Sequence, residues 1–149
     1  MALKRVVVTG LGALTPIGNN LNDFWTGLIE GKSGAAPITY FDTEKFKTKF
    51  ACELKDFDVS LHLDRKQQRK MDRFTQYGMV STEEAIQDSG LDLEKIDKLR
   101  VGVIWGSGIG GIETFQNQML DHASGDGTPR FNPFFIPKMI ADKIGRAHV

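Results

Sequence analysis

The stretch Arg100-Val-Gly-Val-Ile-Trp105 runs directly into the glycine-rich segment Gly106-Ser-Gly-Ile-Gly-Gly111. An apolar, β-branched run that enters a glycine-rich turn is typical of a buried strand. Ile112, Phe115 and Met119 follow at helical spacing, which predicts a helix after the turn. A strand, a turn and a helix in this order indicate an α/β fold with a parallel sheet.

The N-terminus carries a similar pattern. Residues 4–9 are a short β-branched run that ends at Gly10-Leu-Gly12, so they predict a second buried strand. Residues 49–54 alternate between polar and apolar side chains, as an edge strand does. Two central strands are too few for a parallel sheet. The chain is therefore predicted to be a piece of a larger domain.

Two more helices are predicted from capping residues. One is capped by Asn20 or Asn22 and ends at Gly31. A longer helix is capped by Asp64, runs to Ser89 and stops at Gly90. Its predicted buried stripe consists of Met71, Phe74, Gly78 and Ala85.

Composition excludes several classes of protein. The chain has 149 residues, a length typical of one domain, and 19 basic side chains balance 19 acidic ones. General nucleic-acid binding needs a positive excess, so it is excluded. No apolar run is long enough to span a membrane. The single cysteine excludes a disulfide framework and suits the reducing cytoplasm, where we expect the protein to act.

Metal ligands and catalytic pairs do not stand out. The three histidines His62, His122 and His148 show no ligand spacing, and Cys52 reads as a small buried or edge residue. No pair of carboxylates is spaced for acid–base chemistry. We therefore predict no metal site.

The glycine turn also fits the dinucleotide-binding pattern G-x-G-x-x-G, after a strand and before a helix. The full pattern requires a strand ending in Asp or Glu about twenty residues later, and residues 124–129 read as a loop instead. Two other interpretations are a plain tight turn and a turn whose missing side chains let a ligand lie against the backbone.

Residues 64–73 concentrate positive charge in a neutral protein. They carry five basic and two acidic side chains. Lys66, Arg69, Lys70 and Arg73 would share one face of the predicted helix. Cations at a helix N-terminus oppose the helix dipole, so this placement does not serve helix stability. The face is either a docking patch for an acidic partner or simply solvated.

Taken together, these motifs resemble the N-terminal part of a β-ketoacyl-[acyl-carrier-protein] synthase, of the type II elongating kind that serves bacterial fatty-acid synthesis. Their order and spacing agree with that family from residue 2 to about residue 142. The motifs that carry the resemblance are residues 6–12, Thr15-Pro-Ile-Gly18, residues 65–74, residues 106–111 and Asn132-Pro-Phe-Phe-Ile-Pro137.

The resemblance implies a thiolase-like fold, with layers of helices on both sides of a sheet (α-β-α), in a homodimer. This chain would be about the first third of such an enzyme and an incomplete N-terminal half. Residues 1–142 would belong to the ketosynthase domain. Residues 143–149 are predicted to be a non-native tail, because Ile144-Gly-Arg-Ala-His-Val149 reads like a translated sequencing adaptor.

The implied reaction is a decarboxylative Claisen condensation with malonyl-carrier protein. The family uses an acylated cysteine and two histidines, and all three are expected beyond Val149, so no catalytic residue is predicted here and the chain alone is predicted to be inactive. No cofactor is implied, since phosphopantetheine arrives on the acyl carrier protein.

The resemblance also implies peripheral binding residues. Those expected to meet the acidic acyl carrier protein are Lys66, Arg69, Lys70 and Arg130. Those expected at the acyl pocket are Ile109, which would gate the tunnel, and Phe135 and Ile136, which would reach across the dimer.

Two alternatives stay open. A chain-length-factor-like subunit would share the fold but lack the active cysteine, and it would serve as a non-catalytic partner. A dinucleotide-binding α/β domain would rest on the turn at Gly106 alone.

Overall fold

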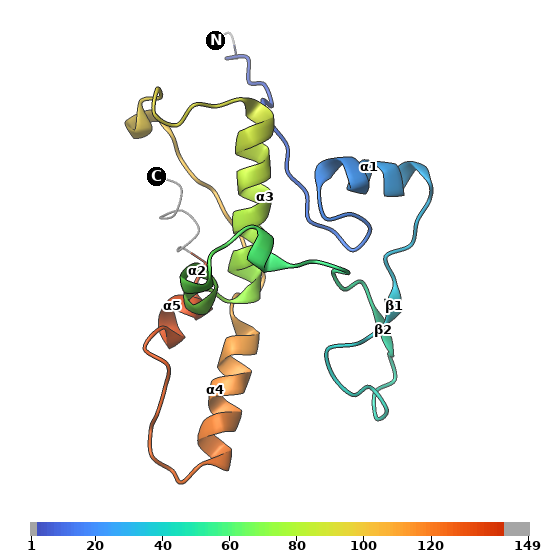
Figure 1. Ribbon diagram of the computed structural model, residues 1–149, viewed down its shortest axis with the longest axis vertical. Coiled ribbons are helices and arrows are strands. Elements are labelled where there is room, and N and C mark those ends of the chain that lie inside the picture. The colour runs from blue at the N-terminus through green and yellow to red at the C-terminus, as the bar shows by residue number, and fades with distance from the viewer. Residues whose placement is uncertain (1–2, 142–149) are drawn as a thin grey trace. The chain divides into compact units, whose positions relative to one another are not determined.

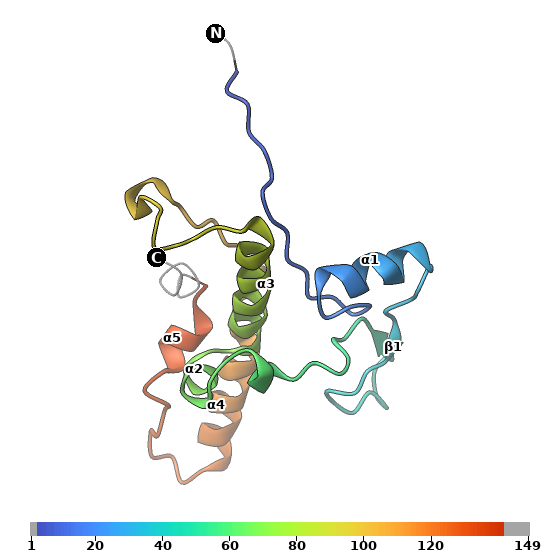
Figure 2. The same ribbon diagram turned by 45° about the horizontal axis from the view of Figure 1, so that its top comes forward.

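A computed structural model describes residues 3–141 (Figures 1 and 2). His148 and the predicted tail 143–149 lie outside the described residues. The elements in chain order are α1 (Leu21–Ile29), β1 (Ala36–Pro37), β2 (Phe50–Ala51), η1 (Val59–Leu61), α2 (Arg65–Lys70), α3 (Arg73–Ser89), η2 (Lys98–Arg100), α4 (Ile112–Ser124) and α5 (Phe135–Met139).

The described residues divide into two compact units. Residues up to 57 and residues 81–91 form the first unit, whereas residues 58–80 and those from 92 onward form the second. The helix α3 therefore contributes its early turns to the second unit and its late turns to the first. Each unit is described by itself.

In the first unit, the N-terminal segment lies directly against the late turns of α3. A Cβ atom on Gly12 would come within 2.0 Å of the Ser81 carbonyl oxygen, so only glycine allows this approach. The Glu84 carboxylate accepts hydrogen bonds from the backbone amides of Ala13 (2.8 Å) and Leu21 (2.7 Å). The glycines of the first predicted turn thus serve packing against a helix.

The helix α1 begins and ends as its sequence predicts. The Asn20 side chain accepts from the Asp23 amide at 2.9 Å and caps the helix. Gly31 adopts a positive φ of 67°, and the amides of Gly31 and Lys32 donate to the carbonyls of Leu28 and Gly27. This pair of bonds satisfies the last carbonyls of the helix.

The sheet differs from the prediction. β1 and β2 pair antiparallel, with Ala36 opposite Ala51 and Pro37 opposite Phe50, which confirms the edge strand predicted within residues 49–54. The predicted central strands at residues 4–9 and 100–105 are unpaired, and this prediction is wrong for the described chain. A strand is held by a neighbour's hydrogen bonds, and no segment within residues 3–141 supplies them, so Val6 (89%) and Ile104 (101%) are exposed.

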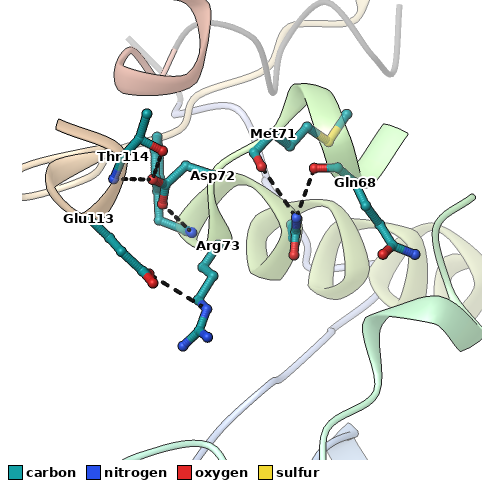
Figure 3. A network of polar contacts seen from close by, with 8 residues as sticks. Gln68, Met71, Asp72, Arg73, Glu113 and Thr114 are labelled. Atoms are coloured by element: carbon teal, nitrogen blue, oxygen red, sulfur yellow. Dashed lines mark hydrogen bonds and ion pairs between the residues drawn. The ribbon is translucent and has the colours of Figure 1, made fainter. Parts of the chain in front are cut away.

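In the second unit, the long helix predicted from Asp64 to Ser89 is broken. Met71 is extended, with φ −122° and ψ 141°, and it separates α2 from α3. The carbonyls of Gln68 and Met71 at the end of α2 accept from the Gln76 amide side chain at 3.2 and 3.3 Å (Figure 3). The Gln76 side chain thus provides hydrogen-bond donors for the carbonyl groups at the break. Asp64 caps α2 through a reciprocal pair of hydrogen bonds with Gln67, as its sequence predicts.

The core of the second unit lies around the start of α3. Leu63, Met79 and Val80 are its buried apolar side chains. Thr75, in the same helix as Met79 and Val80, is fully buried. Of the predicted stripe, Gly78 of α3 is buried, whereas Phe74 and Ala85 of α3, and Met71 at the break before it, are half-buried.

The elements α4 and α5 complete the second unit. α4 begins after the glycine turn and carries Ile112, Phe115 and Met119, as predicted. Figures 1 and 2 show α2 and α5 on the same side of the junction between α3 and α4. Within residues 3–141, no helix is both long and apolar enough to cross a membrane.

Candidate functional site

A groove of about 860 Å³ lies in the second unit, between α2 and the segment that precedes α5. Its lining brings together all four residues predicted to meet a carrier protein, although Arg130 is 60 residues or more away from the other three in the chain. The lining residues are Arg65, Lys66, Arg69, Lys70, Gln118, Arg130, Phe131, Asn132, Pro133 and Phe134.

The groove is strongly cationic. Five of its lining side chains are Lys or Arg, and none is acidic. Among the described residues, Arg65, Lys66 and Arg69 have no carboxylate within ion-pair distance. Because close cations that lack counter-charges raise the local positive potential, the groove is suited to an acidic ligand.

Lys70 and Arg130 are each engaged at the edge of the groove. The Lys70 ammonium lies 5.6 Å from the centre of the Phe134 ring, a cation–π distance. The Arg130 guanidinium pairs with Asp126 at 2.9 Å. Hydrogen bonds from Thr128, and then from Arg130, hold the pKa of the Asp126 carboxyl below its ordinary value of 3.8. Asp126 therefore stays ionised at neutral pH.

Arg73 departs from the predicted basic face. Because the helix breaks at Met71, Arg73 begins α3 and pairs with Glu113 at 3.5 Å instead of lining the groove. The break also places Arg69 and Lys70 in the last turn of α2. Cations are favourable at that end of a helix, so the predicted conflict with the helix dipole is wrong for these two residues.

Aromatic side chains form the apolar wall of the groove. Phe131 and Phe134 line it, and Phe131 stacks on Phe135 with ring centres 5.7 Å apart. Phe135 in turn stacks on Phe115 of α4 at 6.3 Å. This stack fixes the segment 131–135 against α4, so the groove combines a cationic side with an apolar one.

The predicted acyl-pocket residues lie beside this stack. Phe135 and Ile136 open α5, where Phe135 is half-buried and Ile136 is 60% exposed. Ile109 is 77% exposed in the glycine turn. The turn is tied to α5, since the Gly111 amide donates to the Met139 carbonyl at 3.0 Å. The structure thus joins the turn that carries Ile109 to the helix that carries Phe135 and Ile136.

Two amides of the glycine turn, those of Gly110 and Gly111, and two at the start of α4 are used within the protein. The Gly110 amide donates to the Ser107 hydroxyl, the Ile112 amide to the Gly110 carbonyl, and the Thr114 amide to the Asp72 carboxylate. A dinucleotide site needs such amides free for its pyrophosphate. The amides that are already bonded are not available to a pyrophosphate, which disfavours the dinucleotide alternative.

Asp72 is a residue whose role sequence reasoning missed. It is buried, and its carboxylate accepts hydrogen bonds from Phe74 in α3 and from Thr114 in α4 (Figure 3). The available signal was its residue type, because Asp is a preferred first cap of a helix. Because residues 64–89 keep helical spacing throughout, the pattern places Asp72 in the interior of one long helix and not at a helix start.

The remaining candidates are isolated. Among the described residues, no three His, Cys, Asp or Glu side chains could hold a metal ion together. Cys52 is exposed just after β2, which agrees with an edge position. His122 ends up against the Phe131 ring at 5.4 Å, in the last turn of α4.

The chain is similar in sequence to known 3-oxoacyl-[acyl-carrier-protein] synthases. It is 46% identical over 142 residues to the 3-oxoacyl-[acyl-carrier-protein] synthase 2 of Synechocystis sp., a match that covers 93% of this chain and 33% of that protein. The synthase 2 of Staphylococcus aureus strain COL matches with the same identity and coverage. The chain thus spans about a third of the length of these relatives.

Solved structures of ketosynthases also resemble this chain. The ishigamide ketosynthase/chain length factor superposes with a TM-score of 0.77 at 29% identity, over 96% of this chain and 36% of that one. The AntDE:AntF complex, a type II PKS acyl-carrier protein with its ketosynthase, matches with 0.77 at 27% identity, over 97% and 38%. The described residues therefore have the thiolase-like fold of the N-terminal part of ketosynthases.

Residues 3–147 match the family "Beta-ketoacyl synthase, N-terminal domain", and the chain belongs to that family.

Proposed function

We propose that this chain is the carrier-docking part of a 3-oxoacyl-[acyl-carrier-protein] synthase, which elongates acyl chains in the cytoplasm. The observation that carries the proposal is the groove lined by Arg65, Lys66, Arg69, Lys70 and Arg130. These side chains gather in a protein whose formal net charge is zero. The charge is therefore local, as a surface aimed at one acidic partner requires.

The groove suits a folded acidic protein better than a small anion. It is open and about 860 Å³ in volume, and one of its sides is aromatic. An acidic helix could place carboxylates toward α2 and an apolar side chain toward Phe131 and Phe134. Cations would speed association, and the apolar contact would slow dissociation. The AntDE:AntF structure, in which a ketosynthase is in complex with its acyl-carrier protein, supports this partner.

The glycine turn and α5 would serve the acyl chain. In this proposal Ile109 gates the acyl tunnel, and Phe135 and Ile136 line the pocket across a homodimer. The exposure of Ile109 and Ile136 supports it, because side chains that meet a partner subunit or a ligand are uncovered in a single chain.

The chemistry itself would take place on residues outside the 149. A cysteine thiolate takes the acyl group from its carrier, and malonyl-carrier protein then loses CO2 to give a carbanion. The carbanion attacks the acyl thioester, a carbon–carbon bond forms, and the thiolate leaves. We expect the cysteine and two histidines beyond this chain, so the chain alone should catalyse no condensation.

A chimera tests the proposal. Residues 3–141 of this chain would replace the matching third of the Synechocystis synthase 2, and elongation would be assayed with acyl-carrier and malonyl-carrier protein. We expect turnover within about tenfold of the parent enzyme. In the same chimera, Lys66→Glu with Arg69→Glu should raise the KM for the carrier. An active chimera with an unchanged KM in this variant would contradict docking at the groove.

The non-catalytic alternative also has an observation in its favour, since one of the matched structures contains a chain length factor. The two candidates differ at the residue in the position of the active cysteine. Sequencing the native gene past codon 142 decides between them. A cysteine in a Thr-Ala-Cys turn supports the synthase, and any other residue there supports the partner subunit.

A further inference from the structure

We propose that Asp72 is a positioning residue whose single carboxylate caps both α3 and α4. It thereby fixes the Ile109 turn relative to the docking helix α2. This inference rests on the function proposed above for the groove and for Ile109. It assigns a role to a buried carboxylate that neither the docking surface nor the acyl pocket includes.

The first cap is on α3. Asp72 directly precedes Arg73, the first residue of that helix, and its Oδ1 accepts from the Phe74 amide at 3.4 Å. The first amides of a helix have no partner inside the helix, and an Asp side chain at this position is a preferred acceptor. This contact also explains why the chain leaves the helical conformation at Met71.

The second cap is on α4, and it comes from a distance in sequence. The first cap residue of α4 is Gly111, which has no side chain that could accept a hydrogen bond. Asp72 Oδ2 instead accepts from the Thr114 amide at 3.2 Å and from the Thr114 hydroxyl (Figure 3). The amide at the third helical position is thus satisfied by a residue 42 positions away.

The charge of Asp72 suits this double role. The N-terminal ends of α3 and α4 both carry partial positive charge, and Asp72, only 7% exposed, lies where they meet. The neighbouring pair Arg73–Glu113 is 3.5 Å apart, but its side chains are 48% and 51% exposed. Exposed pairs contribute little, so we expect the buried Asp72 carboxylate to contribute more than this pair to holding the two helix starts together.

Asp72 also connects the docking groove to the glycine turn by short steps. Lys70, which lines the groove, is two residues before Asp72. On the other side, Thr114 is three residues after Gly111, whose amide is bonded to Met139 of α5. A ligand that moves the end of α2 would therefore shift Asp72, and with it the start of α4 and the turn that carries Ile109.

Two variants break or weaken the link to α4. Asp72→Ser keeps a short acceptor for the cap of α3 but cannot reach Thr114. Thr114→Val removes the hydroxyl bond with little change in volume. Thr114→Ser keeps the hydroxyl and is the matched control. Amide hydrogen exchange of residues 110–116 is measured in the full chain, with and without a purified acyl carrier protein, together with carrier affinity.

In the free chain, we expect the Thr114 and Phe115 amides to exchange about tenfold faster in Asp72→Ser than in the unaltered protein. Carrier binding should slow exchange of residues 110–116 in the unaltered chain and in Thr114→Ser. This slowing should be lost in Asp72→Ser and reduced in Thr114→Val, while the carrier Kd changes by less than about twofold.

Unchanged exchange in both free variants would overturn the inference, and so would full carrier-induced slowing in both. These outcomes are distinct from failure of the proposed function, in which the unaltered chain does not bind the carrier at all. In that case the free-chain exchange still decides whether Asp72 positions the turn.

Discussion

Arg130 is a groove residue that forms an ion pair with a neighbouring carboxylate. Its guanidinium pairs with Asp126 at 2.9 Å, and both side chains are mostly exposed. Asp126 would compete with the carboxylates of an acidic carrier for Arg130. We predict that Asp126→Asn tightens carrier binding by about two- to fivefold, and that Arg130→Ala weakens it by a similar factor.

The control for this prediction is Asp121→Asn, which removes a negative charge from nearby α4 and has no ion pair among the described residues. Carrier affinity measured by fluorescence anisotropy separates the two. Equal gains in both variants would mean that only net charge matters and that Arg130 has no specific role.

Asp126 also gives a pH prediction. Its hydrogen bonds from Thr128 and Arg130 lower the pKa of its carboxyl below 3.8. A lowered pKa means that the ionised form stabilises the folded loop above pH 3.8, and that this stabilisation is lost as the pH falls through the lowered value. A 13C NMR titration of the Asp126 carboxyl should show a midpoint below 3.8, shifted upward in Thr128→Ala. A midpoint at or above 3.8 in the unaltered chain would contradict the contacts.

Among the elements, the glycine turn offers a matched pair of substitutions. A Cβ on Gly111 would lie 2.6 Å from the Lys138 carbonyl oxygen and 2.8 Å from Met139 Cα, whereas Gly108 has nothing within 4 Å. We predict that Gly111→Ala lowers the free energy of opening α4 by about 1–3 kcal/mol. Gly108→Ala should change it by less than about 0.5 kcal/mol. Hydrogen exchange of the α4 amides measures both, and equal effects would refute the close packing of the turn against α5.

The helices show which features the sequence can predict. Caps at Asn20 and Asp64, the end at Gly31 and the start of α4 follow from local residue types, and the structure has all of them. The break at Met71 was not predicted, because residues on both sides keep the helical spacing. The Asp72 carboxylate after the break bonds to Phe74 and to Thr114, and Thr114 is 42 positions away, so no local pattern shows that contact.

The strands show which features the local sequence cannot predict. Residues 4–9 and 100–105 have strand composition, but a strand also needs a neighbour, and pairing is not a local property. The candidate site could be predicted from local sequence only in part. The face of Lys66, Arg69 and Lys70 followed from helical spacing, whereas the role of Arg130 came only from the family resemblance and no local pattern linked it to α2.

At the scale of the whole molecule, the two unpaired apolar runs should govern behaviour in solution. Val6 and Val8 are 89% and 78% exposed, and Ile104 is fully exposed. Exposed β-branched segments with unpaired backbone groups associate edge to edge. We predict that the 149-residue chain self-associates at micromolar concentration, and that Val7→Lys with Ile104→Lys weakens this association by about tenfold.

Sedimentation velocity measures this association. Leu61→Lys, at an exposed apolar residue outside both runs, is the control and should leave it unchanged. If all variants sediment as a monomer like the unaltered chain, the exposed runs do not drive association.

The cationic groove is proposed to dock an acidic acyl carrier protein. The most direct measurement is the carrier Kd of the full chain at several salt concentrations, for the unaltered protein, for Lys66→Glu with Arg69→Glu, and for the control Lys98→Glu outside the groove. We predict that the unaltered chain and the control bind with affinity that falls steeply as salt rises. The groove variant should lose about tenfold or more at low salt, together with most of the salt dependence. Equal affinities of the groove variant and the control at low salt would show that the cationic face is only solvated and does not dock the carrier.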